Sequence, residues 1–454
     1  MRTLASLLAL TCTGCFATHP LEEGSSGSRL ALVAWEPVDG TGVYGEGLFD
    51  SELGVRCEYS PGPDQALRCL PWPIVRELFT DGACARPAAL IRRGCSERFV
   101  SAGHMLSVTA SCGSPALRYE ARGYRVLGPV DADRFFQIDR SGACVEAASL
   151  PTGEPFELEA LPDERFVRGE VVVGEREDGE RLSYTYIQGE DGSRLQNAYR
   201  YDHERGDYCS ILGGLSGPMP CLISPWGTAF VGESPCDVSF ARKREPRCAA
   251  EESDSFVAAR YDPDGCVVTE VEVFGAGEAW TAEELGMCTP GEGTSYHRLV
   301  ALPEGHVATL SNEPEGTGRI RRVSGRHPWM APFESIGMYF DAELDVDCDP
   351  RLVGDTLRCV PARMRWTAEF ADSACLEPAS VEGEVSCSPY RYTEEHGCVW
   401  PMPVRVFEVG AEIPEAFERD ATGACVRREL RPGTRAHRLE PVPDETFAAF
   451  RRLP

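Results

Sequence analysis

The sequence predicts an all-β protein built from three cysteine-rich units. Three observations support this fold class: strand-like runs along the whole chain, three sets of six cysteines, and short motifs that recur with each set. Helical periodicity is scarce, whereas 45 glycines and 34 prolines punctuate the chain with turn signals. A chain of 454 residues is long enough for several domains or for one large closed β-architecture.

The strand signals are segments in which β-branched and aromatic residues alternate with polar ones. Examples are SRLALVAWE at 28–36, RLSYTYIQG at 181–189, VTEVEVFG at 268–275 and VRVFEVG at 404–410. Turn signals such as EDGE at 177–180 and EDGS at 190–193 separate neighbouring segments. The alternation predicts antiparallel hairpins rather than parallel strands joined by helices.

Eighteen cysteines follow the N-terminal segment and fall into three sets of six. The sets are Cys57, Cys69, Cys84, Cys95, Cys112 and Cys144; Cys209, Cys221, Cys236, Cys248, Cys266 and Cys288; and Cys348, Cys359, Cys375, Cys387, Cys398 and Cys425. The first two cysteines of the three sets are separated by 12, 12 and 11 residues. Such regularity is typical of a disulfide framework.

Motifs around the cysteines recur in the same order. Each unit begins on RLALV, RLSYT or RIRRV and ends on LPDERF, LPEGHV or VPDETF, and LRCLP and LRCVP enclose the second cysteine of the first and third sets. The boundaries predict β repeat units at 28–179, 180–317 and 318–454, that is, a triplicated chain.

The cysteine spacing favours disulfides over metal binding. Zinc sites and thiol redox motifs use closely spaced pairs such as CxxC, and none of the eighteen cysteines has that spacing. A pair about twelve residues apart around a turn is suited to a staple across a hairpin, worth roughly 3 kcal/mol by loop entropy. We expect sequential pairing, first with second, third with fourth and fifth with sixth, among the fifteen connectivities that six cysteines allow in each unit.

The units are expected to form one closed ring. The last segment, ETFAAF at 445–450, corresponds to the strand that leads from one unit into the next, so it can pair with SRLALV at the start of the first unit and hide both edges. With two blades for each unit, the ring would be a six-bladed β-propeller. The alternative is three separate β-domains in a row.

The N-terminus is typical of an exported protein. Residues 1–15, MRTLASLLALTCTGC, combine one positive charge, a short apolar run and small residues. The last four of them resemble a bacterial lipobox, although Cys12 stands where that motif usually has an aliphatic residue. The resemblance implies a lipoprotein signal peptide with lipidation of Cys15, a flexible tether at 16–27, and a place in the cell envelope, with Phe16 favouring the outer membrane. Ordinary signal cleavage and secretion are the alternative.

The charge balance excludes some partners. A formal net charge of −27 argues against nucleic-acid binding, which requires a basic surface, so the membrane is expected as a partner only through the N-terminal lipid. No cofactor motif and no catalytic motif is present, and we expect neither a cofactor nor a metal.

One pair of acids recurs in every unit, just before the first cysteine. The pairs are Asp50 and Glu52, Asp202 and Glu204, and Asp341 and Glu343. Alternate residues of a strand face the same way, so each pair is a candidate ligand-binding site. The alternative is a structural acid that accepts hydrogen bonds from the backbone of its own turn.

Together, the F/Y-D-x-E, cysteine and LRCLP motifs resemble uncharacterised cysteine-rich repeat lipoproteins of myxobacteria, over all three units. The resemblance implies no known activity. The expected function is therefore that of an envelope-anchored, disulfide-stapled β-repeat protein with a binding or structural role and an unknown ligand. The alternative is an exported hydrolase, acting on glycans, that uses carboxylates.

Overall fold

The structure is a computed structural model of the whole chain. It describes residues 24–41, 43–92, 95, 97–109, 115–132, 134–148, 153–176, 180–211, 219–223, 227–231, 239–244, 255–261, 268–281, 284, 294–310, 313–323, 339–362, 364–382, 388–394, 403–420 and 423–453. The fold is all-β, as the sequence predicts, and 3-10 turns at Asp163–Arg165 (η1) and Asp444–Thr446 (η3) interrupt the strands.

Three four-stranded antiparallel meanders form the centre of the fold. Meander 1 is β2 (Leu30–Pro37), β3 (Tyr44–Asp50), β4 (Val55–Pro61) and β5 (Leu67–Pro71). Meander 2 is β15 (Leu182–Gly189), β16 (Arg194–Asp202), β17 (Asp207–Ile211) and β18 (Met219–Ile223). Meander 3 is β26 (Ile320–Val323), β27 (Tyr339–Asp341), β28 (Val346–Val353) and β29 (Thr356–Pro361).

The same turn joins the second and third strands of every meander. It contains one residue with positive φ at the same position, Gly54 at 70°, Gly206 at 67° and Asp345 at 54°. Glycine adopts this left-handed conformation without steric cost, and aspartate tolerates it better than most residues do. The local sequence therefore fixes the turn that follows each recurring aspartate.

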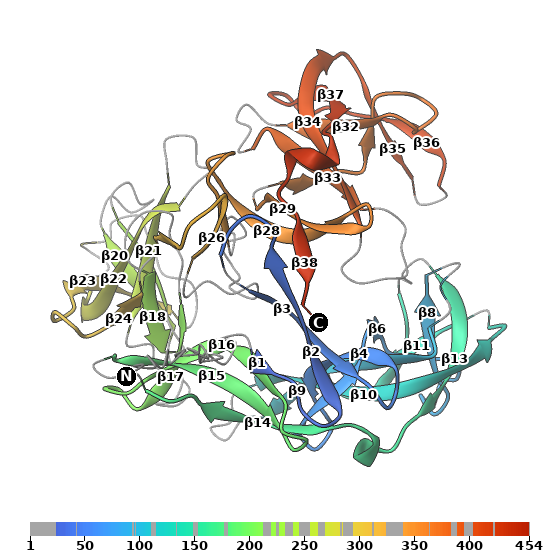
Figure 1. Ribbon diagram of the computed structural model, residues 1–454, viewed down its shortest axis with the longest axis horizontal. Helices are drawn as coiled ribbons and strands as arrows, with labels where there is room; N and C mark the ends of the chain where they lie inside the picture. The colour runs from blue at the N-terminus through green and yellow to red at the C-terminus, as the bar shows by residue number, and fades with distance from the viewer. Residues whose placement is uncertain are drawn as a thin grey trace, which may run out of the picture.

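Strands near the unit boundaries bond to the meander on one side or on both sides. β14 (Arg168–Val173) pairs with β5 and β15. β24 (Ala308–Leu310) pairs with β18, and β25 (Pro314–Glu315) pairs with β26. The last strand, β38 (Phe450–Arg452), pairs with β2, and the two strands lie side by side in Figure 1. This is the pairing that the sequence motifs predict.

An outer lobe follows each meander, and Figure 1 shows the three lobes around the centre. Lobe 1 contains β6 (Ile74–Arg76), β7 (Leu78–Phe79), β8 (Pro87–Ile91), β9 (Phe99–Thr109), β10 (Pro115–Pro129), β11 (Phe136–Ile138), β12 (Cys144–Glu146) and β13 (Glu154–Ala160). Lobe 2 contains β19 (Gly227–Phe230), β20 (Phe240–Arg244), β21 (Phe256–Tyr261), β22 (Val268–Ala279) and β23 (Thr294–Ala301). Lobe 3 contains β30 (Arg365–Trp366), β31 (Glu369–Phe370), β32 (Pro378–Glu382), β33 (Tyr390–Glu394), β34 (Val404–Ile413), β35 (Ala416–Arg419), β36 (Cys425–Arg428) and β37 (Arg435–Pro441).

The lobes differ from the propeller blades that the sequence analysis expects. A propeller blade is a four-stranded sheet, whereas lobe 1 is an eight-stranded sheet and lobe 2 a five-stranded closed barrel. The two longest strands of lobe 1, β9 and β10, have 11 and 15 residues and are longer than the strands of most globular proteins. Most sheets among the described strands are open, so a six-bladed propeller is not the observed architecture.

The cysteines that begin each set form the expected hairpin staples. Cys57–Cys69, Cys209–Cys221 and Cys348–Cys359 join the third and fourth strands of the three meanders, with Cα atoms 5.2, 5.3 and 5.2 Å apart. All six cysteines are at most 4% exposed and lie inside the hydrophobic clusters of their meanders. Each staple is therefore also part of a core.

In the first and third sets, the third cysteine does not pair with the fourth. Cys84 pairs with Cys144, and Cys375 pairs with Cys425, which is the sixth cysteine in each case. The expectation was wrong because strand β8 runs between Cys84 and Cys95, and its five residues span about 16 Å. A disulfide needs Cα atoms within about 7 Å. Strand β32 separates Cys375 from Cys387 in the same way.

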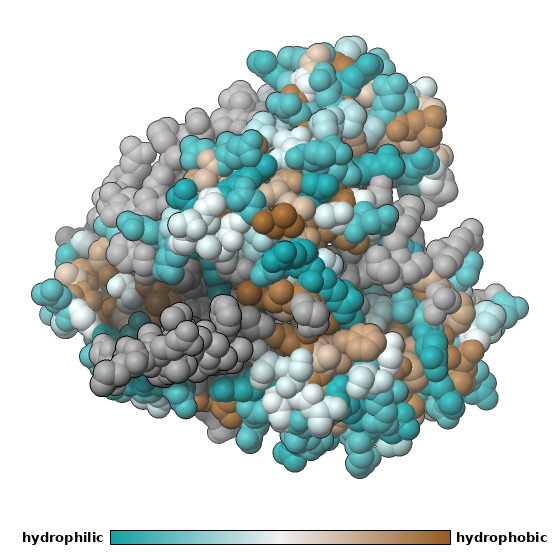
Figure 2. Space-filling view, in the orientation of Figure 1, coloured by the Kyte–Doolittle hydropathy of each residue, from teal (hydrophilic) through white to brown (hydrophobic). Residues whose placement is uncertain are grey.

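Other cysteines of the sequence analysis are only partly described. Cys95 is disulfide-bonded, but its partner lies outside the described residues. Eight further cysteines also lie outside the described residues: Cys15, Cys112, Cys236, Cys248, Cys266, Cys288, Cys387 and Cys398. The five described disulfides are typical of a protein that folds outside the reducing cytoplasm. Figure 2 shows hydrophilic and hydrophobic residues interleaved on the viewed face.

Candidate functional site

The recurring aspartates lie at one structural site in each meander, where an arginine holds them. Asp202 ends β16 and is 0% exposed. Nε and Nη2 of Arg181 donate to its two carboxylate oxygens at 2.8 and 2.6 Å. This two-point geometry is the strongest that an arginine makes with a carboxylate.

The same pair occurs in the other two meanders. Arg29 donates to Asp50 at 2.9 and 2.7 Å, and Arg319 donates to Asp341 through Nε and Nη2, both at 2.9 Å. Asp50 and Asp341 are also 0% exposed. We call each arginine with its aspartate an arginine clamp.

The aspartate of each clamp also binds its own turn. Oδ1 accepts the backbone N–H groups two and three residues later, at 3.0–3.3 Å. These donors belong to Glu52 and Leu53, Glu204 and Arg205, and Glu343 and Leu344. The structural alternative in the sequence analysis describes this geometry.

The recurring glutamates complete the ion pairs at the surface. Glu52, Glu204 and Glu343 lie in the turn rather than on a strand, with 55–68% exposed side chains. Their carboxylates lie 3.0, 3.0 and 2.7 Å from Nη1 of the clamp arginine. Both acids of each pair therefore bind an arginine of the chain. Ligand binding by these acids stays a prediction, and this geometry does not favour it.

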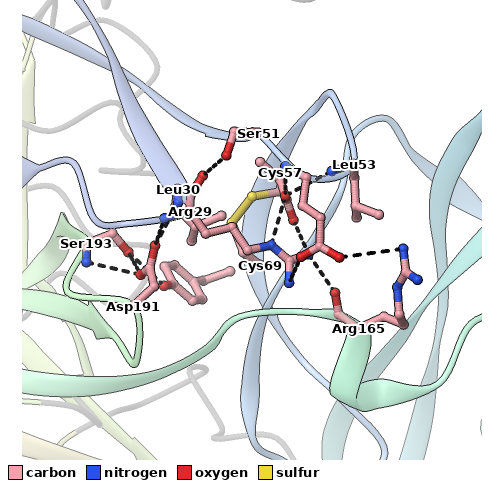
Figure 3. The surroundings of a disulfide bond; sticks show 12 residues. Arg29, Leu30, Ser51, Leu53, Cys57, Cys69, Arg165, Asp191 and Ser193 are labelled. Carbon is pink, nitrogen blue, oxygen red and sulfur yellow. Dashed lines mark hydrogen bonds and ion pairs between the residues drawn. A yellow bond between two sulfur atoms is a disulfide. The ribbon is translucent and has the colours of Figure 1, made fainter.

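Each clamp arginine also reaches the end of its unit. Nη2 of Arg29 donates to the backbone oxygen of Arg165 at 2.7 Å (Figure 3). The equivalent bonds run from Arg181 to His306 at 3.1 Å and from Arg319 to Thr446 at 2.6 Å. One guanidinium thus joins the motif that begins a unit, the turn after its second strand, and the segment that leads out of it.

Sequence reasoning found the acids but missed the arginines. The signal was present, because Arg29, Arg181 and Arg319 are the first letters of the motifs that begin the three units. Their three backbone acceptors occupy the fifth position of LPDERF, LPEGHV and VPDETF. The clamp explains why these motifs recur together.

The electrostatics agree with a structural role. Burial acts to raise the pKa of the Asp202 carboxyl, but hydrogen bonds from Arg181 and from the backbone of Arg205 and Glu204 outweigh burial and lower it. The hydrogen bond to Asp202 raises the pKa of Arg181. Both groups are therefore charged at neutral pH, and each neutralises the other.

Hairpins of one unit hold the start of another. Asp191, between β15 and β16, accepts the N–H groups of Arg29 and Leu30 at 3.1 and 2.7 Å, and Figure 3 shows it beside the Cys57–Cys69 staple. Burial would raise the pKa of Asp191, but backbone hydrogen bonds, led by that from Leu30, lower it. Meander 2 therefore anchors the first strand of meander 1.

A related contact links meander 1 to meander 3. The N–H of Ile320 donates to the oxygen of Asp39 at 3.0 Å, and the N–H of Thr41 donates to the oxygen of Ile320 at 2.8 Å. Asp39 and Thr41 belong to the loop between β2 and β3. Contacts of this kind make the meanders depend on one another.

A separate polar cluster lies inside lobe 1. Glu77 is 6% exposed, and its carboxylate binds Nδ1 of His104 at 2.6 Å and accepts the hydroxyl proton of Tyr124. Burial and the nearby Glu77 charge raise the pKa of Tyr124. His104 stands opposite Glu120 on the neighbouring strand. The Nδ1 contact leaves Nε2 as the ring nitrogen of His104 that does not bind Glu77.

Lobe 3 has a buried charged cluster of a different composition. Arg391 is 2% exposed on β33 and binds Glu382, the hydroxyl of Ser380 at 3.1 Å and the carbonyl of Ser388 at 2.7 Å. These partners surround the guanidinium. The cluster of lobe 1 is thus not a requirement of the lobe fold.

The described residues form neither a three-residue metal site nor a helix that could span a membrane. No group of three histidine, cysteine, aspartate or glutamate residues in the described ranges is arranged to hold a metal ion. Within the same part of the chain, no helix is long and apolar enough to cross a membrane.

Comparison with known proteins places the chain in a family. A family model matches residues 7–447, and its description is a family of unknown function, DUF7481. No curated protein and no solved structure matches the chain. With nearly its whole length matched, the chain belongs to DUF7481, a family of unknown function.

Proposed function

We propose that the protein is an envelope-anchored lipoprotein whose three stapled units form one ring, with a binding or structural role rather than an enzymatic one. Cleavage before Cys15 and acylation of that residue would hold the ring in the outer membrane by the part of the tether that precedes β1. The single observation that carries the proposal is the threefold arginine clamp.

The clamp supports a scaffold role because the recurring aspartates already bind an arginine of the chain. A catalytic or metal-binding carboxylate needs a free oxygen, whereas both oxygens of Asp50, Asp202 and Asp341 bind an arginine of the chain. The bonds connect the two ends of every unit. The clamp recurs in all three units, and in each it fixes the shape of the unit. A fixed shape is what a protein requires if it presents a binding surface or acts as a structural spacer.

Ring closure is supported by the strand pairs. β38 pairs with β2, and Ala449, just before β38, forms a bridge with Arg358 of β29. These contacts repeat those that β14 makes with β5 and β15. The chain would then close where unit three meets unit one, while β24 and β25 still end two separate sheets between units two and three.

The anchoring part is tested by cell fractionation. Cys15→Ser should move the protein from the membrane fraction to the soluble envelope fraction. Cys12→Ser, a matched change three residues away, should leave it in the membrane. The proposal is contradicted if Cys15→Ser stays in the membrane or if Cys12→Ser leaves it.

One observation favours a second candidate, an exported hydrolase. In the cluster of lobe 1, the buried Glu77 orients His104 so that Nε2 can accept a proton from water. This pairing of a histidine with an orienting carboxylate occurs in many hydrolases. The acids that would act are then Glu77 and Glu120 rather than those of the clamps.

The second candidate has its own assay. Purified protein is incubated with peptidoglycan, and new reducing ends are counted. If the protein is a hydrolase, wild type releases them and His104→Gln releases far fewer, with an unchanged fold by circular dichroism. Equal, background release by both proteins eliminates this candidate for that substrate.

A further inference from the structure

An exposed group of tyrosines lies on one face of meander 2. Tyr199 and Tyr208 are 47% and 40% exposed. Tyr201 stands directly opposite Tyr208, with ring centroids 5.4 Å apart, and Tyr199 shares its face because it is two residues away on β16. We call Tyr199, Tyr201 and Tyr208 the tyrosine surface.

The other meanders lack this surface. The residues directly paired at the position of Tyr201 and Tyr208 are Phe49 with Arg56 in meander 1. In meander 3 they are Phe340 with Asp347. The meander fold therefore does not require a tyrosine pair at this position, and its presence calls for a contact specific to meander 2.

The chain enters the fold at the same strand. β1 (Gly24–Ser25) pairs with Leu195 and Arg194 of β16. β15 pairs along the opposite edge of β16, so β1 and β17 share one edge. Leu195 lies four residues from Tyr199, which corresponds to about 13 Å along a strand.

The tether limits how far this strand can be from the membrane. Eight residues lie between Cys15 and Gly24, so Gly24 is nine steps along the chain from Cys15 and at most about 30 Å away when the segment is fully extended. An acyl chain on Cys15 would therefore hold meander 2 closer to the bilayer than a long linker would. The lobes that follow are joined to the anchor only through the fold.

We propose that the tyrosine surface contacts the headgroup region of the membrane that holds the acylated Cys15, and so orients the ring. This inference rests on the proposed function. Tyrosine is suited to that region because its ring is apolar and its hydroxyl forms hydrogen bonds with water and headgroups. A net charge of −27 excludes electrostatic attraction to anionic lipids as the cause, so an aromatic contact is the favourable one.

Hydroxyl-radical footprinting tests the contact. The acylated full-length chain is reconstituted in vesicles of phosphatidylethanolamine and phosphatidylglycerol, and oxidation rates are compared with those of Cys15→Ser protein without vesicles. Tyr199 and Tyr208 should be oxidised severalfold more slowly in the membrane-bound protein. Met105 and Trp366, which are 40% and 58% exposed in lobes 1 and 3, serve as internal references and should not change.

Three results would overturn the inference. They are equal tyrosine rates in both samples, protection of Met105 or Trp366 instead, and loss of the protection when the acylated protein is diluted at constant lipid, which would indicate contact between copies. The mass of the N-terminal peptide is read in the same experiment. If Cys15 is not acylated, the proposed function fails, and the membrane contact fails with it. If Cys15 is acylated and the tyrosines are unprotected, only the contact fails.

Discussion

Replacing Arg181 by methionine should destabilise the protein, because it leaves a buried carboxylate without its cation. Asp202 is 0% exposed, and Arg181 supplies two of its hydrogen bonds. Removing one partner of a buried ion pair costs about 3–5 kcal/mol. Asp202 keeps the N–H groups of Glu204 and Arg205, so we expect a loss near the lower limit, about 3 kcal/mol.

The assay is urea unfolding at pH 7, followed by tryptophan fluorescence with the disulfides intact. Arg125→Met is the matched control, because Arg125 also pairs with a glutamate, Glu159, but both side chains are about half exposed, at 54% and 46%. An exposed pair contributes about 0–1 kcal/mol. The two substitutions are chemically identical and differ in the burial of the pair.

A double substitution separates lost charge compensation from lost packing. If the cost arises from the uncompensated charge of Asp202, then Asp202→Asn in the Arg181→Met background should restore part of the stability, because the buried group is then neutral. If Arg181→Met costs no more than Arg125→Met, the clamp is not a stabilising lock and our reasoning is wrong.

Three further predictions concern acid, the staples and the closure of the fold. The lowered pKa of Asp202 means that its stabilisation is complete above the unfolded pKa of about 4 and is lost as pH falls through the lower folded pKa. The free energy of unfolding should therefore fall on acidification below about pH 4, and a value that stays flat to pH 2 would contradict this. Removing the Cys84–Cys144 bond, which closes 60 residues, with a pair of serines should cost about 4 kcal/mol by loop entropy in the urea titration, and a loss below about 1 kcal/mol would refute the estimate. Phe450→Ala should lower the free energy of unfolding by about 3–5 kcal/mol in a urea titration. Phe450 is 3% exposed and packs on Tyr339 where the last strand meets the first. A loss below about 1 kcal/mol would show that closure contributes little to stability.

Local signals predicted the parts of the fold that are local. Eleven residues with a Pro/Gly/Asp turn between Cys57 and Cys69 specify a hairpin and therefore its staple. The return of the last strand to the first could also be predicted, because the end of unit three carries the motif that leads one unit into the next. Both inferences need only short stretches of sequence.

The pairing of Cys84 with Cys144 depends on contacts that local sequence does not carry. Phe79 of β7 pairs with Phe136 of β11, and β11 pairs with β12, which begins at Cys144. Sheet pairing across 60 residues decides which sulfur atoms meet. Spacing along the chain gives no measure of that distance.

The recurring acids show a different limit. Their recurrence was visible, but whether Asp202 binds a ligand or Arg181 depends on the direction in which a guanidinium 21 residues away points. The arginine that begins the starting motif of each unit is visible in the sequence, but its contact with the aspartate is visible only in the fold. The cluster of Glu77, His104 and Tyr124 could not be predicted from the sequence, because Glu77 lies between β6 and β7 and its partners lie on β9 and β10, 27 and 47 residues further along the chain.

The most direct test of the stapled, anchored scaffold is the intact mass of protein extracted from its native membranes, with and without reduction, after free thiols are alkylated. The account predicts a chain that begins at an acylated Cys15, in which no cysteine of the described disulfides is alkylated before reduction. Peptide mapping should then return Cys57–Cys69 and Cys84–Cys144 as crosslinked pairs. An unacylated chain with alkylated cysteines at these positions would contradict it.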